Sequence, residues 1–237
     1  MKLSKSEKEF IKNYDIHDYE IPLASVDLCI FSIFEQSLKI LLVKRTEYPF
    51  KDRWTLPGGF VDIANDQDLE STATRKLEEK TSVKTHFLEQ IESVGNRERD
   101  PRGWSITVLY FALLSNSEAE ISLEEDVQWV SVKEVQNYDL AFDHHDLFLK
   151  AMRRLQRKVS YTTLPMHILP KKFTLAQLQQ AYEIIIDHKV EKKSFRRRID
   201  ASNLLVDTGD IQQDGGRPAK LYSMRKGSET HFYNRAI

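Results

Sequence analysis

The sequence lacks features that define large classes of proteins. It has a single cysteine, Cys29, which excludes an internal disulfide, and the apolar pattern around Cys29 predicts a buried strand position. No apolar run approaches the roughly 20 residues of a membrane span, and the first six residues carry no apolar secretion core. We therefore expect a cytoplasmic protein that does not bind membranes.

What the sequence does have is an uneven distribution of charge. Its composition, 41% hydrophobic and 30% charged, is typical of a folded chain, and 237 residues favour two domains. Residues 1–149 contain 17 Lys and Arg against 28 Asp and Glu, a net charge of −11, whereas residues 150–237 contain 18 against 8, a net charge of +10. A basic tail on an acidic body predicts that the tail binds a polyanion. The alternative is a solvated basic surface that only pairs with the acidic body.

The body carries the pattern of one mixed α/β domain. Short apolar, β-branched segments predict strands, the first two of which form a hairpin. The expected strands cover residues 24–34, 38–43, 87–94, 105–114 and 126–132. Among them, a helix is expected to begin near Asp66 or Asp68, with Leu69, Ala73 and Leu77 facing the core.

Residues 56–83 contain the motif on which the functional prediction for the body depends. Adjacent glycines in the turn Leu56-Pro-Gly-Gly-Phe60 allow the backbone to approach a ligand closely. From Gly59 onward the stretch resembles the Nudix signature G-x5-E-x7-R-E-U-x-E-E-x-G-U, where U is a bulky apolar residue. The matching positions are Gly59, Arg75, Leu77, Glu79 and Val83. The departures are Lys76 and Lys80 for glutamates, Ser82 for the glycine, and two extra residues that leave Gln67 in place of the first glutamate.

These departures remove carboxylates that Nudix chemistry needs. The resemblance implies a Mg²⁺ site, and Mg²⁺ is a hard cation that takes oxygen ligands while it polarises the attacking water. With Lys76 and Lys80 beside Glu79, the charge of that helical face changes from −3 to +1, which repels a metal ion. The same lysines can contact phosphates directly. We therefore predict no catalytic residue and no metal ligand, and a site that binds a nucleoside diphosphate derivative.

The expected ligand site combines cations from a strand end, the glycine turn, the helix and the arginine-rich loop of residues 95–104. It comprises Arg45, Arg53, Phe60, Arg75, Lys76, Glu79, Lys80 and Arg102. Two alternatives stay open. One is a solvated helix face that binds nothing, and the other is a working pyrophosphohydrolase, which an assay of ADP-ribose turnover with Mg²⁺ or Mn²⁺ would reveal.

Two further helical patterns flank the body. Residues 4–19 predict a short amphipathic helix or a loose arm. Asp143-His-His-Asp146 has the residue types of a metal site, but adjacent residues on a helix point apart. We interpret it as the polar start of a helix whose apolar stripe is Leu147, Ala151, Leu155 and Val159. This helix joins the acidic body to the basic tail, so the expected domains are a Nudix-like effector-binding domain at 1–148 and a DNA-binding domain at 149–237.

The tail predicts two helices followed by a pair of strands. Thr174 and Gln177 form a capping box that starts the first helix, with Phe173 and Leu178 as its hydrophobic staple and an apolar stripe to about Asp187. Ser194 is expected to cap the second helix. Its inward residues are Phe195, Ile199 and Ser202, its outward residues Arg196, Arg197 and Asn203, with Arg198 near the margin. Residues 204–207 and 220–223 should pair as strands around a loop at 215–219.

Such a tail is typical of a winged helix-turn-helix, whose second helix lies in the major groove of DNA. Its wing reaches the DNA backbone or the minor groove. The predicted DNA contacts are Lys192, Lys193, Ser194, Arg196, Arg197, Arg198, Asn203, Arg217 and Lys220. The alternative is a small helical scaffold with a salt-bridged surface.

Body and tail together resemble the Nudix-related transcriptional regulators (NrtR) of bacteria over almost the whole chain. The motifs that carry the resemblance are Leu56 to Phe60, Val94-Gly-Asn96, Arg102-Gly-Trp104, Ala141-Phe-Asp-His144, Ser194 to Arg198, Leu204-Leu205, Asp207-Thr-Gly209, Gly216 to Ala219 and Leu221-Tyr222. It implies an α+β fold, in which an N-terminal Nudix-like α/β/α sandwich with a mixed sheet precedes a C-terminal winged helix-turn-helix domain. It also implies a homodimeric repressor of NAD-biosynthesis genes that binds a palindromic operator in double-stranded DNA. Such a repressor requires no cofactor and is released from DNA by ADP-ribose as effector. The alternative of a related regulator whose effector is a sugar such as arabinose stays open.

Overall fold

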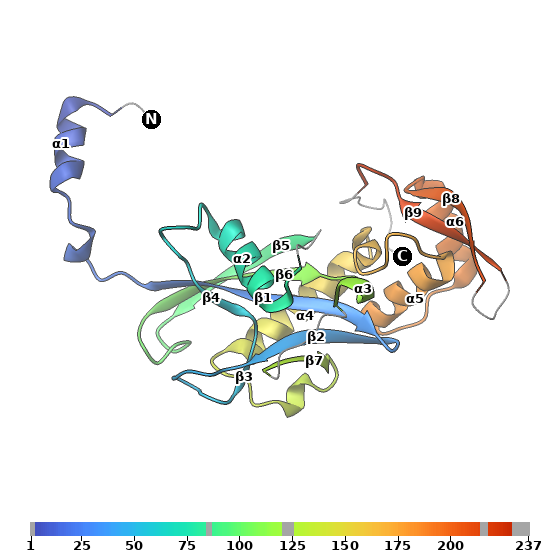
Figure 1. Ribbon diagram of the computed structural model, residues 1–237, viewed down its shortest axis with the longest axis horizontal. Coiled ribbons are helices and arrows are strands. Elements are labelled where there is room, and N and C mark those ends of the chain that lie inside the picture. The colour runs from blue at the N-terminus through green and yellow to red at the C-terminus, as the bar shows by residue number, and fades with distance from the viewer. Residues whose placement is uncertain (1–2, 84–86, 120–125, 214–217, 229–237) are drawn as a thin grey trace.

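The fold is organised around a mixed sheet (Figure 1), and the computed structural model describes residues 3–83, 87–119, 126–213 and 218–228. The main path of the sheet is β3 (Trp54–Thr55), β2 (Ser37–Lys44), β1 (Leu23–Phe34), β6 (Ser105–Leu113) and β5 (Leu88–Asn96). In addition β4 (Gly58–Phe60) pairs with β1, and β7 (Val127–Ser131) pairs with β2. The pair β1 and β6 is parallel and the others are antiparallel. The expected hairpin and strands are confirmed.

A helix layer covers each face of this sheet. Side chains alternate along a strand, so Leu28 and Ile30 of β1 pack with Ala73 and Leu77 of α2 (Leu69–Thr81). Cys29 and the other odd-numbered side chains of β1 point to the opposite face, where α4 (His144–Val159) packs. Cys29 is fully buried as predicted, and burial raises the pKa of its thiol well above the ordinary value. The predicted α/β/α sandwich is thus confirmed.

The start of α2 is confirmed, but its predicted apolar stripe is wrong at one position. Asp68 caps the helix by accepting the backbone N–H of Ser71 at 2.7 Å. Leu69, the first helical residue, is exposed because this first turn lies beyond the packed sheet. Thr72 is buried there instead, with its hydroxyl donating to Asp66 at 2.8 Å.

The tail folds as two helices and a strand pair, namely α5 (Leu175–Ile186), α6 (Lys192–Ser202), β8 (Leu205–Gln212) and β9 (Ala219–Met224). The capping box of Thr174 and Gln177 is confirmed, with reciprocal hydrogen bonds of 3.1 and 2.7 Å. The prediction that Ser194 caps α6 is wrong. Glu191 is the cap, because its carboxylate is long enough to accept two backbone N–H groups, from Lys193 at 2.9 Å and Ser194 at 2.6 Å.

Helix α4 lies between body and tail and packs against both. Leu155 and Val159 belong to one continuous core that extends from Phe111 of the sheet to Tyr182 of α5 and Phe195 of α6. The Tyr182 hydroxyl also donates to the carbonyl of Thr162 at 2.6 Å. The division expected between residues 148 and 149 falls inside this shared helix. The body and the tail therefore meet through packed side chains rather than through a linker.

Ahead of β1, the helix α1 (Lys5–Asn13) stands away from the rest of the molecule (Figure 1). None of its nine residues is buried. Of the two predicted alternatives, a short amphipathic helix or a loose arm, the structure has the helix. The short elements η1 (Ile16–Asp18), α3 (Asn116–Ala119), η2 (Val135–Asn137) and η3 (Leu164–Met166) complete the described structure. In the described part of the chain, no helix is long and apolar enough to cross a membrane.

Candidate functional site

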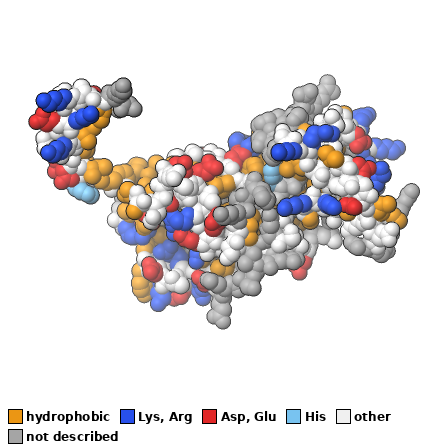
Figure 2. Space-filling view, turned by 45° about the horizontal axis from the view of Figure 1, so that its top comes forward, with side chains coloured by type: hydrophobic (Ala, Val, Ile, Leu, Met, Phe, Trp, Pro, Cys, Tyr) orange, Lys and Arg blue, Asp and Glu red, His pale blue; other side chains and the backbone are white. Residues whose placement is uncertain are grey.

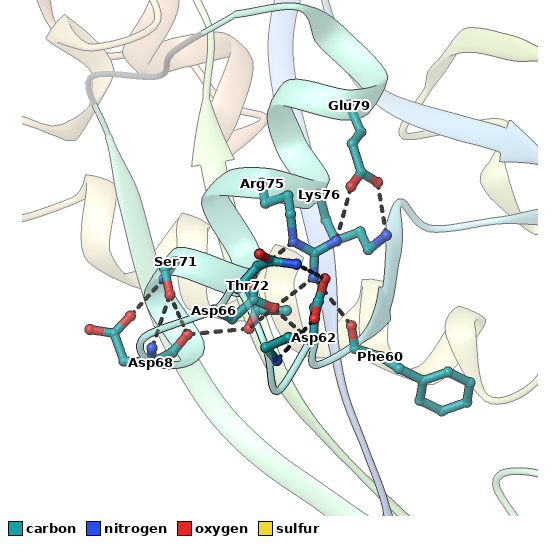
Figure 3. A network of polar contacts seen from close by, with 11 residues as sticks. Phe60, Asp62, Asp66, Asp68, Ser71, Thr72, Arg75, Lys76 and Glu79 are labelled. Carbon is teal, nitrogen blue, oxygen red and sulfur yellow. Dashed lines mark hydrogen bonds and ion pairs between the residues drawn. The ribbon is translucent and has the colours of Figure 1, made fainter.

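A cluster of ion pairs covers the face of α2 that carries the signature residues (Figure 3). Arg75 donates to Asp66 through Nε at 2.8 Å and through Nη2 at 2.6 Å, and to one oxygen of Glu79 at 2.9 Å. Lys76 Nζ lies 2.8 Å from the other oxygen of Glu79. Burial acts to raise the pKa of Glu79, but the hydrogen bonds from Lys76 and Arg75 outweigh it, and the pKa is lowered. Glu79 is therefore a carboxylate fully engaged by cations.

Asp66, rather than Gln67, supplies the acidic partner that the loop before α2 offers to Arg75. Gln67, which the spacing leaves in place of the first glutamate, is exposed, whereas Asp66 lies against the guanidinium of Arg75. Hydrogen bonds from Arg75 hold the pKa of the Asp66 carboxyl well below its usual range. Both carboxylates near the signature helix face are thus paired with cations. The residues present do not fit a Mg²⁺ site, which needs free oxygen ligands.

A second candidate for a metal site is the stretch Asp143-His-His-Asp146 at the start of α4. No cluster of three or more His, Cys, Asp or Glu suited to a metal ion occurs among the described residues. In the sequence Asp143-His-His-Asp146, His144 is buried while His145 and Asp146 are exposed, so these neighbours point apart along the start of α4. The metal-site interpretation of this stretch therefore has no support in the geometry.

The two glycines of the turn allow close approaches of two different kinds. A Cβ atom on Gly58 would lie 2.4 Å from the carbonyl oxygen of Val26 and 2.6 Å from Oδ1 of Asp27, because β4 lies directly against β1. A Cβ atom on Gly59 would lie 2.7 Å from Cε of Lys76. The stem of Lys76 therefore crosses the turn and brings its ammonium group to the signature face. The close approach of this backbone to a ligand stays a prediction.

Two of the arginines predicted for the ligand site lie against the ring of Phe142. The guanidinium carbon of Arg45 lies 4.8 Å from the centre of the Phe142 ring, and that of Arg102 lies 5.8 Å from it. Arg102 also lies 4.9 Å from the ring of Phe60, and Asp100 orients it through hydrogen bonds of 3.0 and 2.7 Å. Burial and the neighbouring Arg102 lower the pKa of Arg45. Two cations held together in this way favour the binding of an anion between them.

Arg53 extends this cluster at its edge. Its guanidinium carbon lies 5.3 Å from the ring of Phe50, which makes an edge contact with Phe142 at 4.8 Å between ring centres. Arg53 is also paired with Asp139 at 3.1 Å. Phe50 and Phe142 both have positive φ, of 62° and 56°, a conformation that bulky side chains rarely adopt outside functional sites. The sequence prediction missed both aromatic residues.

A buried polar network supports the turn from below, and the sequence prediction missed it as well. Nδ1 of His144 accepts the backbone N–H of Leu56 at 3.0 Å, and burial lowers the pKa of the imidazole. Because an amide can only donate, the ring proton is on Nε2, which lies 3.5 Å from Asp27. Arg99 joins Asp27 at 3.2 Å to Asp143 at 3.1 Å. The network thus connects the ligand turn to the first turn of α4.

Two hollows adjoin these cations. A cleft of about 890 Å³ is lined by Phe60, Arg97, Arg102, Trp104 and the chain that leads into β1, at residues 20–23. A smaller hollow of about 190 Å³ lies on the other side of the turn, between Arg45 and Lys80. No ion pair of Lys80 with another described residue is recorded, so its ammonium group is available to a ligand.

The second candidate surface is α6, whose cations face solvent. Lys192, Lys193, Arg196 and Arg197 are exposed and Arg198 is partly buried, as predicted. None of the four exposed cations forms an ion pair with another residue in the described ranges. Phe195 and Ile199 on the opposite side are buried in the core. Lys and Arg side chains accordingly gather at the tail end of the molecule (Figure 2).

The other predicted DNA contacts differ in their surroundings. Asn203 ends α6 with a φ of 53° and accepts two hydrogen bonds from Arg225, so part of its polar capacity is used within the fold. Ser194 is partly buried in the first turn of α6. Lys220 on β9 is paired with Asp207 at 2.8 Å. Arg217 lies outside the described residues.

Comparisons with known families divide the chain in the same order. Residues 24–151 match the NUDIX domain family, and residues 165–224 match the NrtR DNA-binding winged helix domain. The chain is 48% identical over 219 residues to the ADPR responsive transcriptional repressor NtrR of Acinetobacter baylyi, which covers 92% of this chain and 88% of that protein.

Solved structures are similar over the same extent. Shewanella oneidensis NrtR complexed with a 27mer DNA is 41% identical, covers 90% of this chain and 99% of that chain, and superposes with a TM-score of 0.87. The NUDIX domain of the same protein complexed with ADP ribose is 42% identical, covers 65% of this chain and 99% of that chain, and has a TM-score of 0.59. The predicted two-part architecture is confirmed.

Proposed function

The chain belongs to the NrtR family of Nudix-related regulators, and from this we propose that it is a DNA-binding transcriptional repressor that ADP-ribose releases from its operator. One observation carries the proposal. A single chain joins an exposed basic helix in a winged helix domain to a Nudix-type turn whose carboxylates are neutralised by its own cations. The first feature suits a polyanion, and the second suits a phosphate ligand that is held without hydrolysis.

ADP-ribose fits the cations around the turn better than a neutral ligand does. Arg45 and Arg102 lie together on Phe142, and Lys80 lies across a hollow from Arg45, so positive charge borders the turn on two sides. A diphosphate carries the negative charge that would balance these cations. The cleft beside Phe60 and Trp104 offers aromatic surface to a nucleobase. The repressor of A. baylyi is described as ADPR responsive, which favours the same effector here.

The same geometry supports the proposal that hydrolysis is weak or absent. Glu79 is engaged by Arg75 and Lys76, and Asp66 is engaged by Arg75. Neither carboxylate can bind a divalent cation without first losing these ion pairs. Electrostatic stabilisation of a diphosphate by lysine and arginine alone holds the ligand but activates no water. The chain's own residues therefore bind and orient the diphosphate.

Helix α4 is the proposed route from the effector to DNA. Leu56 of the turn donates to His144, and Phe142 carries Arg45 and Arg102, so a ligand at the turn acts on the first turn of α4. At its other end α4 packs against α5 within the shared core. We propose the functional division at residues 148 and 149, with α4 serving both parts. An effector shifts the DNA-binding equilibrium only through its different affinity for the two states, and α4 is the element whose position distinguishes them.

The protein is proposed to act as a cytoplasmic homodimer at a palindromic operator of NAD-biosynthesis genes. A palindrome presents two equal half-sites about one helical turn apart, and reading both requires two copies of α6. In this scheme ADP-ribose favours a dimer geometry in which the two helices cannot occupy both half-sites. Release then signals a rise in a product of NAD turnover.

The test is a DNA-binding titration with competing effectors. Labelled promoter DNA from upstream of the protein's own operon is bound to the full chain and followed by fluorescence anisotropy, while ADP-ribose, NAD or arabinose is added. Release by ADP-ribose alone is the expected result. Release by arabinose alone would instead identify a sugar-responsive regulator. Parallel chromatography of the ADP-ribose after incubation with Mg²⁺ or Mn²⁺ should show it intact, and rapid turnover would identify a hydrolase.

A further inference from the structure

A groove between the body and the tail has the form of a small-molecule site. It lies where β2, α4 and α5 come together (Figure 1), and its volume is about 360 Å³. Its described lining residues include none of those predicted for the effector site. Small molecules bind preferentially in concave, mostly apolar sites at junctions of this kind. We call it the junction groove, lined by Leu38, residues 132–133, α4 between Phe148 and Gln156, and the chain from Ile184 to Asp187.

The interior of the junction groove is apolar. Leu38, Phe148 and Ile185 form its buried surface, and each is at most 5% exposed. Beside them Leu149 stays 41% exposed and Met152 is half-buried. Covering such a surface with a ligand is favourable, because apolar atoms then leave water. The groove therefore favours a ligand with an apolar part.

The walls of the groove are held in place by the shared core beneath it and by two polar contacts. Lys133, just after β7, pairs with Asp187 at the end of α5 at 2.7 Å. Nε2 of Gln156 on α4 donates to the carbonyl of Ile185 on α5 at 3.3 Å. The groove is thus formed before a ligand arrives, and a preformed site loses less conformational entropy on binding.

Arg153 is the cation of the groove that is available to an anion. It donates to the carbonyl of Leu149 within its own helix at 3.3 Å, and it forms no ion pair with another described residue. Three other cations of α4 are already paired with carboxylates of β5. These pairs are Lys150 with Glu92, Arg154 with Glu89, and Lys158 with Glu89.

The charge at the rim of the groove matches an anion with a single charge. Lys133 and Arg153 against Asp187 give the rim a net charge of +1. One carboxylate balances it, because a guanidinium presents two parallel N–H donors to a carboxylate. A diphosphate carries more negative charge than the rim can balance. A divalent cation would meet a single carboxylate, that of Asp187, which Lys133 already occupies.

We propose that the junction groove is a second effector site, which takes an amphipathic monoanion such as an aromatic or branched aliphatic carboxylate. The carboxylate binds Arg153 at the rim, and the apolar part covers Leu149, Met152 and Phe148. A ligand in the groove contacts body and tail together, so its binding is linked to their relative position. Its effect on DNA rests on the proposed function, whereas its binding does not.

Isothermal titration calorimetry with sodium 1-naphthoate tests the binding step. This probe has one carboxylate on an aromatic body, and neutral 1-naphthamide is its matched control. We expect saturable binding of one naphthoate per chain and affinity about tenfold lower for the amide, because a hydrogen bond to a charged group is the stronger one. Equal affinity for the two probes would show apolar adhesion only. That result, or no binding because another molecule of the chain covers the groove, would overturn the proposal.

Substitutions locate the bound naphthoate. Arg153→Glu and Leu149→Asp alter exposed side chains of the groove, so circular dichroism should stay unchanged while each weakens naphthoate binding by about tenfold or more. Arg157→Glu changes an exposed arginine one turn further along α4, outside the groove, and should leave the affinity within about twofold. An equal loss in Arg157→Glu, or no loss in either groove variant, would overturn the site.

Two further measurements separate this site from the effector turn. Lys76→Glu with Lys80→Glu should keep the naphthoate affinity, and a loss would place naphthoate at the turn and overturn the proposal. Saturating naphthoate should change the operator dissociation constant at least about fivefold in anisotropy titrations, and Arg153→Glu should abolish that change. An operator that ADP-ribose releases but bound naphthoate leaves unaffected would overturn the effector role while the proposed function stands.

Discussion

Helices α2 and α6 both present several cations, but they use them in opposite ways. On α2, Arg75 and Lys76 are joined to Asp66 and Glu79, so their positive charge is balanced inside the fold, whereas Lys80 forms no ion pair with another described residue. On α6 the sequence from Lys192 to Ser202 contains five cations and one acid, and its exposed cations form no ion pair with another described residue. Balanced cations are fixed in position before a ligand arrives, whereas unbalanced cations add long-range attraction.

This difference matches the two kinds of anion. A small diphosphate must be recognised by groups already held in place, because ordering long side chains around it lowers affinity. DNA offers a continuous array of charge, so its attraction grows with the number of free cations and falls with salt. In the proposed function the same residue types bind the effector on α2 and DNA on α6, and their neighbours distinguish the two proposed roles.

Reversing the charge on α2 should give the largest effect. Lys76→Glu with Lys80→Glu is expected to weaken ADP-ribose binding by roughly 3–6 kcal/mol, because a hydrogen bond to a charged group contributes roughly 1.5–3 kcal/mol. Isothermal titration calorimetry measures the loss. Operator affinity without effector should stay within about twofold. Lys39→Glu, at a lysine paired with Glu35 in the β1–β2 hairpin, is the control. Unchanged ADP-ribose affinity in the double variant would remove α2 from the effector site.

Removing one arginine from α6 should distinguish base-specific contacts from general electrostatic attraction to DNA. Arg197→Ala is expected to weaken operator binding by about 1–3 kcal/mol if its side chain contacts a base edge, with a much smaller loss on random DNA. Anisotropy titrations on both DNA molecules give the two values. Arg153→Ala removes an exposed arginine from α4 and should change neither. An equal loss on operator and random DNA would assign Arg197 to the phosphate backbone instead.

A third change addresses the route between the two helices. Phe142→Leu removes the ring that holds Arg45 and Arg102 above the start of α4. The ratio of operator dissociation constants with and without saturating ADP-ribose, about 5–150 for a typical allosteric coupling, should fall toward one. Calorimetry confirms that ADP-ribose still binds at the concentrations used. A variant that binds both ligands and keeps the original ratio would exclude Phe142 from the coupling.

The smallest effect concerns pH. Burial lowers the pKa of His144 below its ordinary value of 6.5, so below pH 6.5 the unfolded chain takes up a proton that the folded chain resists. Stability should therefore fall as pH decreases, by at most about 1.4 kcal/mol per pH unit from this group. Urea unfolding between pH 7.5 and 5.5 should show a shallower dependence in His144→Gln. Equal slopes in the two proteins would show that His144 does not cause the pH dependence of stability.

Local patterns predicted the elements of both regions well, because their signals lie within a few residues. The capping box at Thr174 and the buried face of α6 depend only on neighbouring positions, and both are confirmed. Two local predictions failed. Glu191 rather than Ser194 caps α6, because its carboxylate accepts two amides, and Leu69 is exposed at the start of α2 instead of facing the core.

The centre of the effector site was beyond local patterns. Phe142 and His144 are separated from the turn by more than 80 residues, and Asp27 lies about 30 residues before it. They meet because β1 pairs with β4 in the sheet and Leu140, just ahead of α4, forms a bridge with Trp54 of β3, which no spacing along the chain reveals. Isolated polar residues within apolar stretches were the available signal. Asp27 is one such residue, the single charged residue of β1.

The contact between Lys76 and Gly59 bears on how such a protein can change in evolution. Lysine and glutamate codons differ by one base, so a return to an acidic helix face is mutationally close. However, the Lys76 stem fills the space above Gly59 and its ammonium group balances Glu79. Replacing Lys76 by glutamate alone would remove this ion pair and add a third carboxylate to a face that already holds Asp66 and Glu79. In the proposed site, each single-base intermediate would therefore hold phosphate less well before it could hold a metal ion.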